Sequence, residues 1–336
     1  MASFKQVLKR AAVISAGAWL VYALSGCGGN PFTEPEDKYA NGAWPPRPLP
    51  SPDGSSIVFA VQRKGVAQIA RIDPDGSRLT LLTHGDRAAD SPAYSPDGKH
   101  LVYSGSLGIA RGLFLTVLQT GQSRQLTRPG KCLDMYPSFS PDGKRIVFAR
   151  AYTHRRYSMG GWNWYEWDLC MVNADGSGEK RLTHEKFYLM TAPYVSPDSR
   201  RIVFSAVPSG TEDGGHTRAY SLQARTGKYR VITDASDICS SPSFSLDGHR
   251  IVFVSSRGSD PSDYGYEVWT MDRDGGSEIR LTRQNDSFHN PFYMPDGRSI
   301  VLAREVGNSA HNELWRMDAD GKNLHRIVDQ SSVSDE

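Results

Sequence analysis

The stretch S-P-D-G-K-R-I-V-F-A-R, which runs from Ser140 to Arg150, decides the fold because the chain repeats it. Its first half is typical of a tight turn, since proline presets φ, aspartate accepts hydrogen bonds from the following backbone and glycine tolerates positive φ. Its second half is rich in β-branched and aromatic residues and predicts a short strand. Related stretches begin at residues 51, 95, 140, 196, 245 and 294, so consecutive starts lie 44 to 56 residues apart. This spacing is typical of the four-stranded blades of a β-propeller.

Each repeat also contains signals for the other strands of such a blade. A Pro-x-aromatic segment precedes the turn, as in Pro137-Ser138-Phe139, and a third strand follows, as in Asp168 to Val172. A second turn with Asp and Gly and a closing Leu-Thr complete the repeat, as in Leu182-Thr183. The sequence therefore predicts an all-β fold, a six-bladed propeller with four strands in each blade. Because the first and last repeats each show four strands, we expect no blade shared between the two ends of the ring.

This pattern resembles the TolB-type β-propeller repeat, whose hallmark is an Asp, then Pro-x-aromatic-Ser-Pro-Asp-Gly, then a strand. The resemblance covers about residues 44–328 and implies a TolB-like propeller for that region. It is a weak guide to function, because the same propeller serves scaffolds, sensors and enzymes. TolB itself has a folded domain ahead of its propeller, whereas a signal and a tether are expected here. The resemblance therefore implies the fold and not the specific partnerships of TolB.

The N-terminus indicates an exported lipoprotein. Basic residues are followed by an apolar run at residues 11–23, which is too short to span a membrane and typical of a signal peptide. Leu24-Ser25-Gly26-Cys27 resembles a bacterial lipobox, which implies cleavage before Cys27 and a lipid on its thiol. An ordinary secretory signal with an incidental cysteine is the alternative. We expect residues 1–26 to be the signal peptide and residues 27–43 to be the lipidated Cys and a flexible tether. Residues 44–328 are expected to form the propeller, and residues 329–336 a disordered tail.

Charge and cysteine content narrow the possible partners and the location. The formal net charge of +2 becomes −1 without the three basic residues of the signal, so nothing favours nucleic acid as a partner. Gly28 after the cysteine favours outer-membrane sorting, on the periplasmic side, if the cell has two membranes; otherwise we expect the cell surface. Three further cysteines, Cys132, Cys170 and Cys239, are an odd number and argue against a disulfide framework.

The longest insertion, Ala151 to Glu166 in the third repeat, is the predicted partner-binding segment. It combines aromatic residues with arginines, the residue types enriched in binding hot spots. The contact residues predicted from it are Arg156, Tyr157, Trp162 and Trp164. Two alternatives remain for these rings: the insertion folds over its own blade and buries them, or they form a stacking platform for a sugar.

An enzyme is the competing class of function. Several histidines fall in loops predicted on the same face as the insertion: His84, His154, His184, His216, His289 and His311. Such residues could hold a metal at the propeller mouth, as in the oligogalacturonate lyases, which have a related propeller. However, the chain has no H-x-H, no H-E-x-x-H and no G-x-S-x-G motif, so we predict no metal and no cofactor. Aspartates 90, 134 and 237 are expected to cap backbone N–H groups between blades.

The sequence therefore favours a non-enzymatic protein, anchored to the membrane by its lipid, whose propeller serves as a protein-binding scaffold or sensor in the cell envelope. The expected partner is an envelope protein or peptide. The alternative is a carbohydrate-binding protein or a metal-dependent enzyme, similar to a lyase or hydrolase, with a pocket at the propeller mouth. Convergence of three or more histidines on that mouth would favour the enzyme.

Overall fold

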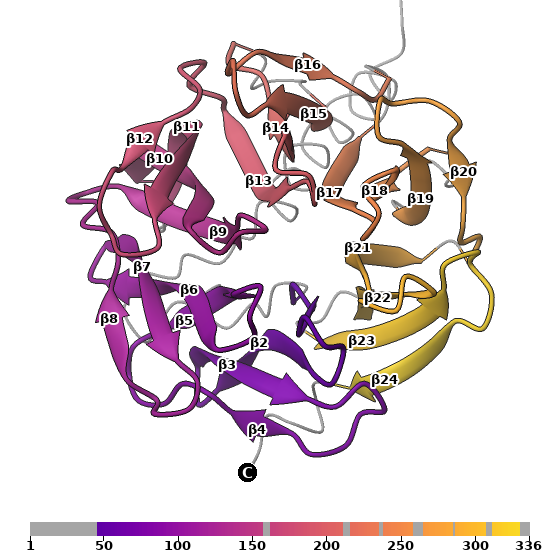
Figure 1. Cartoon of the computed structure of the whole chain (residues 1–336), viewed down its shortest axis with the longest axis horizontal. Helices are drawn as coiled ribbons and strands as arrows, with labels where there is room; N and C mark the ends of the chain where they lie inside the picture. The colour runs from indigo at the N-terminus through magenta and orange to yellow at the C-terminus, as the bar shows by residue number, and fades with distance from the viewer. Residues whose placement is uncertain are drawn as a thin grey trace, which may run out of the picture.

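The computed structural model describes residues 46–156, 162–210, 216–234, 238–257, 265–284, 286–306 and 311–329. Within these ranges every regular element is a β-strand, and the sheets are arranged in a ring around a common centre (Figure 1). The predicted all-β propeller is therefore confirmed. Among the described residues we find no helix with the length and hydropathy needed to cross a bilayer.

Four of the sheets have four strands each. The first consists of β1 (Leu49–Pro50), β2 (Ile57–Arg63), β3 (Val66–Ile72) and β4 (Thr80–Leu81). Another consists of β13 (Leu189–Val195), β14 (Arg201–Val207), β15 (Arg218–Gln223) and β16 (Tyr229–Val231). The next consists of β17 (Cys239–Phe244), β18 (Arg250–Ser255), β19 (Glu267–Asp272) and β20 (Ile279–Arg280). The last consists of β21 (Ser287–Tyr293), β22 (Ser299–Val306), β23 (His311–Asp318) and β24 (His325–Asp329).

The remaining strands form one eight-stranded sheet. Its strands are β5 (Ala89–Tyr94), β6 (His100–Leu107), β7 (Ala110–Val117), β8 (Ser123–Gln125), β9 (Leu133–Phe139), β10 (Arg145–Arg156), β11 (Trp162–Asn173) and β12 (Lys180–Arg181). The prediction of six separate four-stranded blades is therefore wrong: the structure has four blades of four strands and this larger sheet.

The larger sheet forms because β7 has a partly open edge. The short strand β8 pairs only with Phe114 to Thr116 of β7, so the start of β7 is left uncovered. There Arg111 pairs in parallel with Leu133 of β9, and the backbone N–H of Arg111 donates to the carbonyl of Cys132 (3.3 Å). One parallel pair thus joins two repeats that the sequence pattern treats as separate units.

The Ser-Pro-Asp-Gly segments are tight turns, as predicted, and each is held by its own side chains. In the turn that begins at Ser140, the serine hydroxyl donates to Asp142 (2.5 Å) and accepts from the backbone N–H of Arg145 (3.0 Å). The backbone N–H of Gly143 donates to the Ser140 carbonyl (2.8 Å), and Gly143 has a φ of 69°. The turn therefore fixes where the following strand begins.

In four of the six repeats, the strand before the turn is irregular at the residue that precedes the repeated proline. Ser91, Tyr136, Ser241 and Asn290 have φ between 47° and 56°, and the strand registers shift at these points. Such shifts are β-bulges, which bend a strand and increase its twist. The bulges curve the inner strands around the centre of the ring.

The two ends of the ring meet by side-chain packing, and within the described residues the first and last sheets share no strand. One hydrophobic cluster contains Val58 and Ile69 of the first sheet together with Val301 and Leu314 of the last sheet. A polar contact adds to it, because the Asn290 side-chain amide donates to the carbonyl of Pro46 (3.3 Å).

Candidate functional site

The predicted partner-binding insertion forms the outer part of the β10–β11 hairpin. Both strands have twelve residues, whereas their counterparts in the other sheets have six to eight. At a rise of about 3.3 Å per residue, the hairpin extends roughly 13–20 Å further. Arg156 pairs with Trp162 at its far end. Tyr157 and the side chains of Arg156 and Trp162 lie outside the described residues, so their contact roles stay predictions.

Trp164, the fourth predicted contact residue, is packed into the molecule. Its side chain is 3% exposed and belongs to a hydrophobic cluster with Trp167, Leu133 and Phe187. The His154 ring lies 4.8 Å from the Trp164 ring, centroid to centroid. For this residue the structure therefore matches the alternative in which the insertion buries its rings, and a role in partner binding stays a prediction.

The following loop braces one side of the hairpin. Glu166 accepts from the Thr153 hydroxyl (3.0 Å) and from the Lys186 ammonium (3.2 Å). These hydrogen bonds lower the pKa of Glu166, with the Thr153 hydroxyl as the larger cause. The Tyr165 ring lies 5.3 Å from the Tyr188 ring. The near half of the hairpin is thus a fixed support for the residues at its far end.

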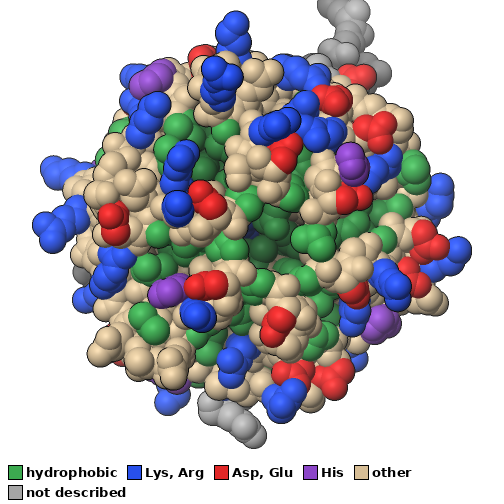
Figure 2. Space-filling view, in the orientation of Figure 1, with side chains coloured by type: hydrophobic (Ala, Val, Ile, Leu, Met, Phe, Trp, Pro, Cys, Tyr) green, Lys and Arg blue, Asp and Glu red, His purple; other side chains and the backbone are tan. Residues whose placement is uncertain are grey.

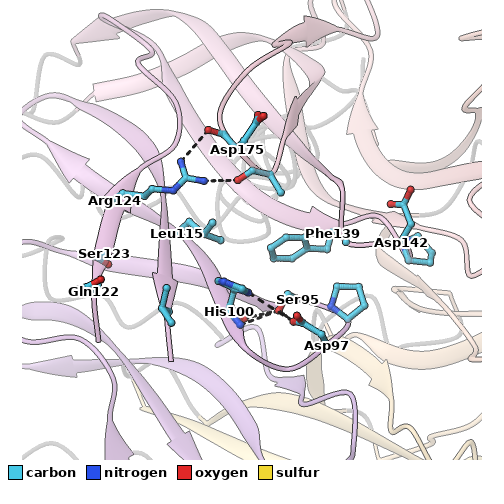
Figure 3. A pocket seen from close by; sticks show the side chains of 15 residues that line it. Ser95, Asp97, His100, Leu115, Gln122, Ser123, Arg124, Phe139, Asp142 and Asp175 are labelled. Atoms are coloured by element: carbon cyan, nitrogen blue, oxygen red, sulfur yellow. Dashed lines mark hydrogen bonds and ion pairs between the residues drawn. The ribbon is translucent and has the colours of Figure 1, made fainter. Parts of the chain in front are cut away.

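A groove of about 980 Å³ lies on the opposite face, where the Pro-Asp-Gly turns are (Figure 3). The repeat pattern gives no signal for this groove, because its walls come from two repeats that the eight-stranded sheet brings together. Leu115, Val117 and Phe139 supply apolar surface, and the prolines of two turns, Pro96 and Pro141, line it further.

Most of the charged groups of the groove are already used by the fold. Asp97 accepts from Ser95 and from the backbone N–H of Lys99, and these bonds lower its pKa. The Arg124 guanidinium donates to the carbonyls of Ala174 (2.5 Å) and Asp175 (3.2 Å), as Figure 3 shows. The groove therefore offers apolar contact with a polar rim, which suits binding better than proton transfer or nucleophilic attack.

A second cavity, of about 320 Å³, lies at the centre of the same face and shares Pro96, Phe139 and Pro141 with the groove. Figure 2 shows this face, with a central hollow bordered by hydrophobic side chains. Aromatic residues from the segments before five of the turns line the cavity: Tyr94, Phe139, Tyr194, Phe244 and Tyr293. The turn prolines surround its mouth, and Arg47 also lines it.

The aspartates expected to cap backbone groups pair with arginines instead. Asp134 is fully buried and accepts from Arg150 Nε (2.6 Å) and Nη2 (2.9 Å) as well as from the Thr127 hydroxyl (2.6 Å). Asp90 forms an ion pair with the buried Arg111. That expectation is corrected for these two residues, because a buried guanidinium needs an anionic partner more than an exposed loop N–H does. Asp237 lies outside the described residues.

The histidines do not gather in the described part of the chain. His289 is buried and lies beside Glu305 (3.4 Å), whereas His100 lines the groove on the other face. Within the described ranges, no three His, Cys, Asp or Glu side chains are placed to hold a metal ion. Cys132, Cys170 and Cys239 are free thiols, and burial raises the pKa of Cys170 to about 11. That thiol is therefore a poor nucleophile near neutral pH.

Comparison with known proteins places this geometry among propellers. The profile of the TolB beta propeller domain matches residues 40–187 and 168–336. A TolB homolog of Chlorobium chlorochromatii is 27% identical over 151 residues, which are 45% of this chain and 31% of that protein. The Tol-Pal system protein TolB of Francisella tularensis subsp. mediasiatica is 27% identical over 190 residues, covering 44% of this chain and 42% of that protein.

Among solved structures, TolB from Acinetobacter baumannii is similar, with a TM-score of 0.61 and 22% sequence identity. The match covers 83% of this chain and 62% of that one. The chain thus spans less than half of the length of the two curated relatives. At this identity, the likeness to the solved structure concerns the fold alone.

Proposed function

The chain belongs to the TolB β-propeller family, and from this premise we propose that it is a lipoprotein of the cell envelope whose propeller binds another envelope protein. In this proposal the Cys27 lipid holds the chain to the membrane outside the cytoplasm. The β10–β11 hairpin makes the contact, with Arg156, Tyr157 and Trp162 at its far end and Trp164 supporting it from the core.

The length of the hairpin is the observation that supports this proposal best. No other hairpin of the described sheets has twelve-residue strands, and the extra residues are rich in aromatic side chains and arginine. The near half is braced by Lys186 and Tyr188. A rigid platform of this kind lowers the entropy that is lost when a partner binds. A relative is itself named as a protein of the Tol-Pal system, which agrees with a function in protein–protein binding.

Site-specific photo-crosslinking in the living cell tests the proposal. A photoreactive phenylalanine analogue is placed at position 162 in the full lipoprotein, and at position 246 in a control. Leu246 suits the control because its side chain is 61% exposed and lies in a Pro-Asp-Gly-type turn on the opposite face. We expect one discrete adduct with a single envelope protein from position 162 only, lost when Arg156 is changed to Ala.

Adducts from position 246 alone would move the interface to the turn face. Adducts from neither position would contradict a protein-binding scaffold. Trp162→Ala is a better loss-of-contact variant than Trp164→Ala, since removing the buried Trp164 ring would cost about 3–5 kcal/mol of stability.

A further inference from the structure

Arg47 is a buried cation with few hydrogen bonds to its guanidinium. Its side chain is 5% exposed, and its guanidinium carbon lies 5.2 Å from the centroid of the Phe292 ring. One hydrogen bond is formed with described residues, from Nη1 to the carbonyl of Pro137 (3.3 Å), and Nε is buried without a partner. Arginine has five N–H donors, and a buried charge is unfavourable unless it is paired and hydrogen-bonded. Arg47 therefore has spare donors that a bound anion would satisfy.

The central cavity gives an anion access to the guanidinium of Arg47. Arg47 is the only charged residue among the described residues that line it. Arg47 lies two residues before β1 and contacts Pro137 of β9 and Phe292 of β21, which both precede the turns of their repeats. The turn prolines line the mouth, so Arg47 lies deeper in a cavity that is open on the turn face. The volume of about 320 Å³ lies at the small end of the range for ligand pockets.

Tyr194 supplies a second donor beside Arg47. Its ring lies 5.8 Å from the same Phe292 ring, and the residue lines the cavity. The hydroxyls of the other two lining tyrosines are already close to side chains, Tyr94 to Ser56 (3.0 Å) and Tyr293 to Thr270 (3.3 Å). No such partner holds the Tyr194 hydroxyl within the described residues.

Both donors keep their protons near neutral pH. Burial lowers the pKa of Arg47 to about 10, so its guanidinium is still positively charged at pH 7. Burial raises the pKa of Tyr194, so its hydroxyl remains an O–H donor. Neither group therefore needs a change of pH to receive an anion.

The aspartates around the mouth do not make the rim strongly negative, so the rim does not repel an anion. Asp97, Asp142 and Asp247 each accept from the serine hydroxyl and a backbone N–H of their own turn. In most of the turns a basic residue or histidine lies two positions after the aspartate: Lys99, Lys144, Arg200, His249 and Arg298. The charge at the rim is therefore close to balanced, whereas the inside is positive.

We propose that the central cavity is a binding site for a carboxylate carried on an aromatic or branched apolar group. Arg47 pairs with the carboxylate, the Tyr194 hydroxyl donates to it, and the ring of aromatic side chains contacts the apolar part. Such a carboxylate comes either from a small organic acid or from the C-terminus of a peptide. The site lies on the face opposite the hairpin end and does not depend on the proposed function.

Calorimetric titration of the full chain in detergent tests the site with four probes. These are 3-phenylpropionate, its amide, the peptide acetyl-Gly-Gly-Phe with a free C-terminus, and the same peptide as an amide. We expect binding of one or both acids, with at least about thirtyfold weaker binding of the matching amide, because a buried charge pair is lost. Preference for the small acid or for the peptide acid identifies the source of the carboxylate.

Three variants locate the binding. Arg47→Gln should weaken acid binding at least about thirtyfold, and Tyr194→Phe about tenfold. The matched control Arg124→Gln removes a guanidinium from the neighbouring groove and should leave acid binding unchanged. If Arg47→Gln does not fold, Tyr194→Phe and the comparison of acids with amides still test whether a carboxylate binds in the cavity. The proposal would be overturned if acids and amides bound equally well, or if neither acid bound. It would also be overturned if Tyr194→Phe and a folded Arg47→Gln both bound the acids as the parent does.

Discussion

At the scale of single residues, Ser199 stands where the other five repeats have glycine, and its φ is 58°. A residue with a Cβ is disfavoured in this region by about 1–2 kcal/mol, while glycine loses about 0.5–1 kcal/mol of chain entropy. We therefore expect Ser199→Gly to raise the free energy of unfolding by about 0.5–1 kcal/mol, measured by urea denaturation. The reciprocal control, Gly143→Ser, should lower it. A lower stability for Ser199→Gly would show that its hydroxyl matters more than its backbone.

Within the larger sheet, we expect replacement of Arg150 to lower the free energy of unfolding most. It is buried, and it joins Asp134 on β9 to Glu179 just before β12. Arg150→Met leaves the fully buried Asp134 without its cation, so we expect a loss of about 3–5 kcal/mol in urea denaturation. Adding Asp134→Leu should restore much of that loss, because the unpaired charge is then gone. Equal stability of the single and double variants would contradict this account.

At the scale of the element, the repeated turn should make the stability of the protein fall at acidic pH. The Ser51 hydroxyl and the Ser55 N–H lower the pKa of Asp53 to about 2, and similar bonds lower the pKa of Asp97 and Asp142. A carboxyl whose pKa is lower in the folded state stabilises above its unfolded pKa of about 3.9 and loses that contribution as the pH falls. We expect the melting temperature to fall between about pH 4 and pH 2.

The Asp53→Asn variant is the control for this prediction. It removes one of the titrating groups, so its melting temperature should fall less steeply over the same pH range than that of the parent. An identical slope for the two proteins would mean that the turn aspartates do not carry the pH dependence.

The strands and turns could be predicted from sequence because each rests on residues close together in the chain. Ser140, Asp142 and Gly143 form their turn within six residues, and the β-branched and aromatic run that follows is a buried strand, as its composition indicates. Three features could not be predicted in this way, since they depend on distant residues. The pairing of Arg111 with Leu133 needs the open edge of β7. The burial of Trp164 and the position of Arg47 in the central cavity depend on packing between sheets.

At the scale of the whole molecule, the proposed attachment to the membrane rests on one residue. If Cys27 carries the lipid, Cys27→Ser removes both the acyl chains and the membrane affinity they provide. We expect the parent in the membrane fraction and the variant in the soluble fraction outside the cytoplasm, with lipid labelling lost. A variant that stays with the membrane would show that another contact retains the protein.

The meeting of the first and last sheets has a mechanical consequence. Pro46 touches Asn290 of the last sheet, while the chain immediately continues through Arg47 into β1 of the first sheet. A pull from upstream of Pro46 would therefore be applied directly across the seam where the ring closes. No strand of the described chain is shared across the seam, so the tension would act on the packing of Val58 and Ile69 against Val301 and Leu314. In a protein held by its N-terminus, a pulling force would thus act first at the seam between the first and last sheets.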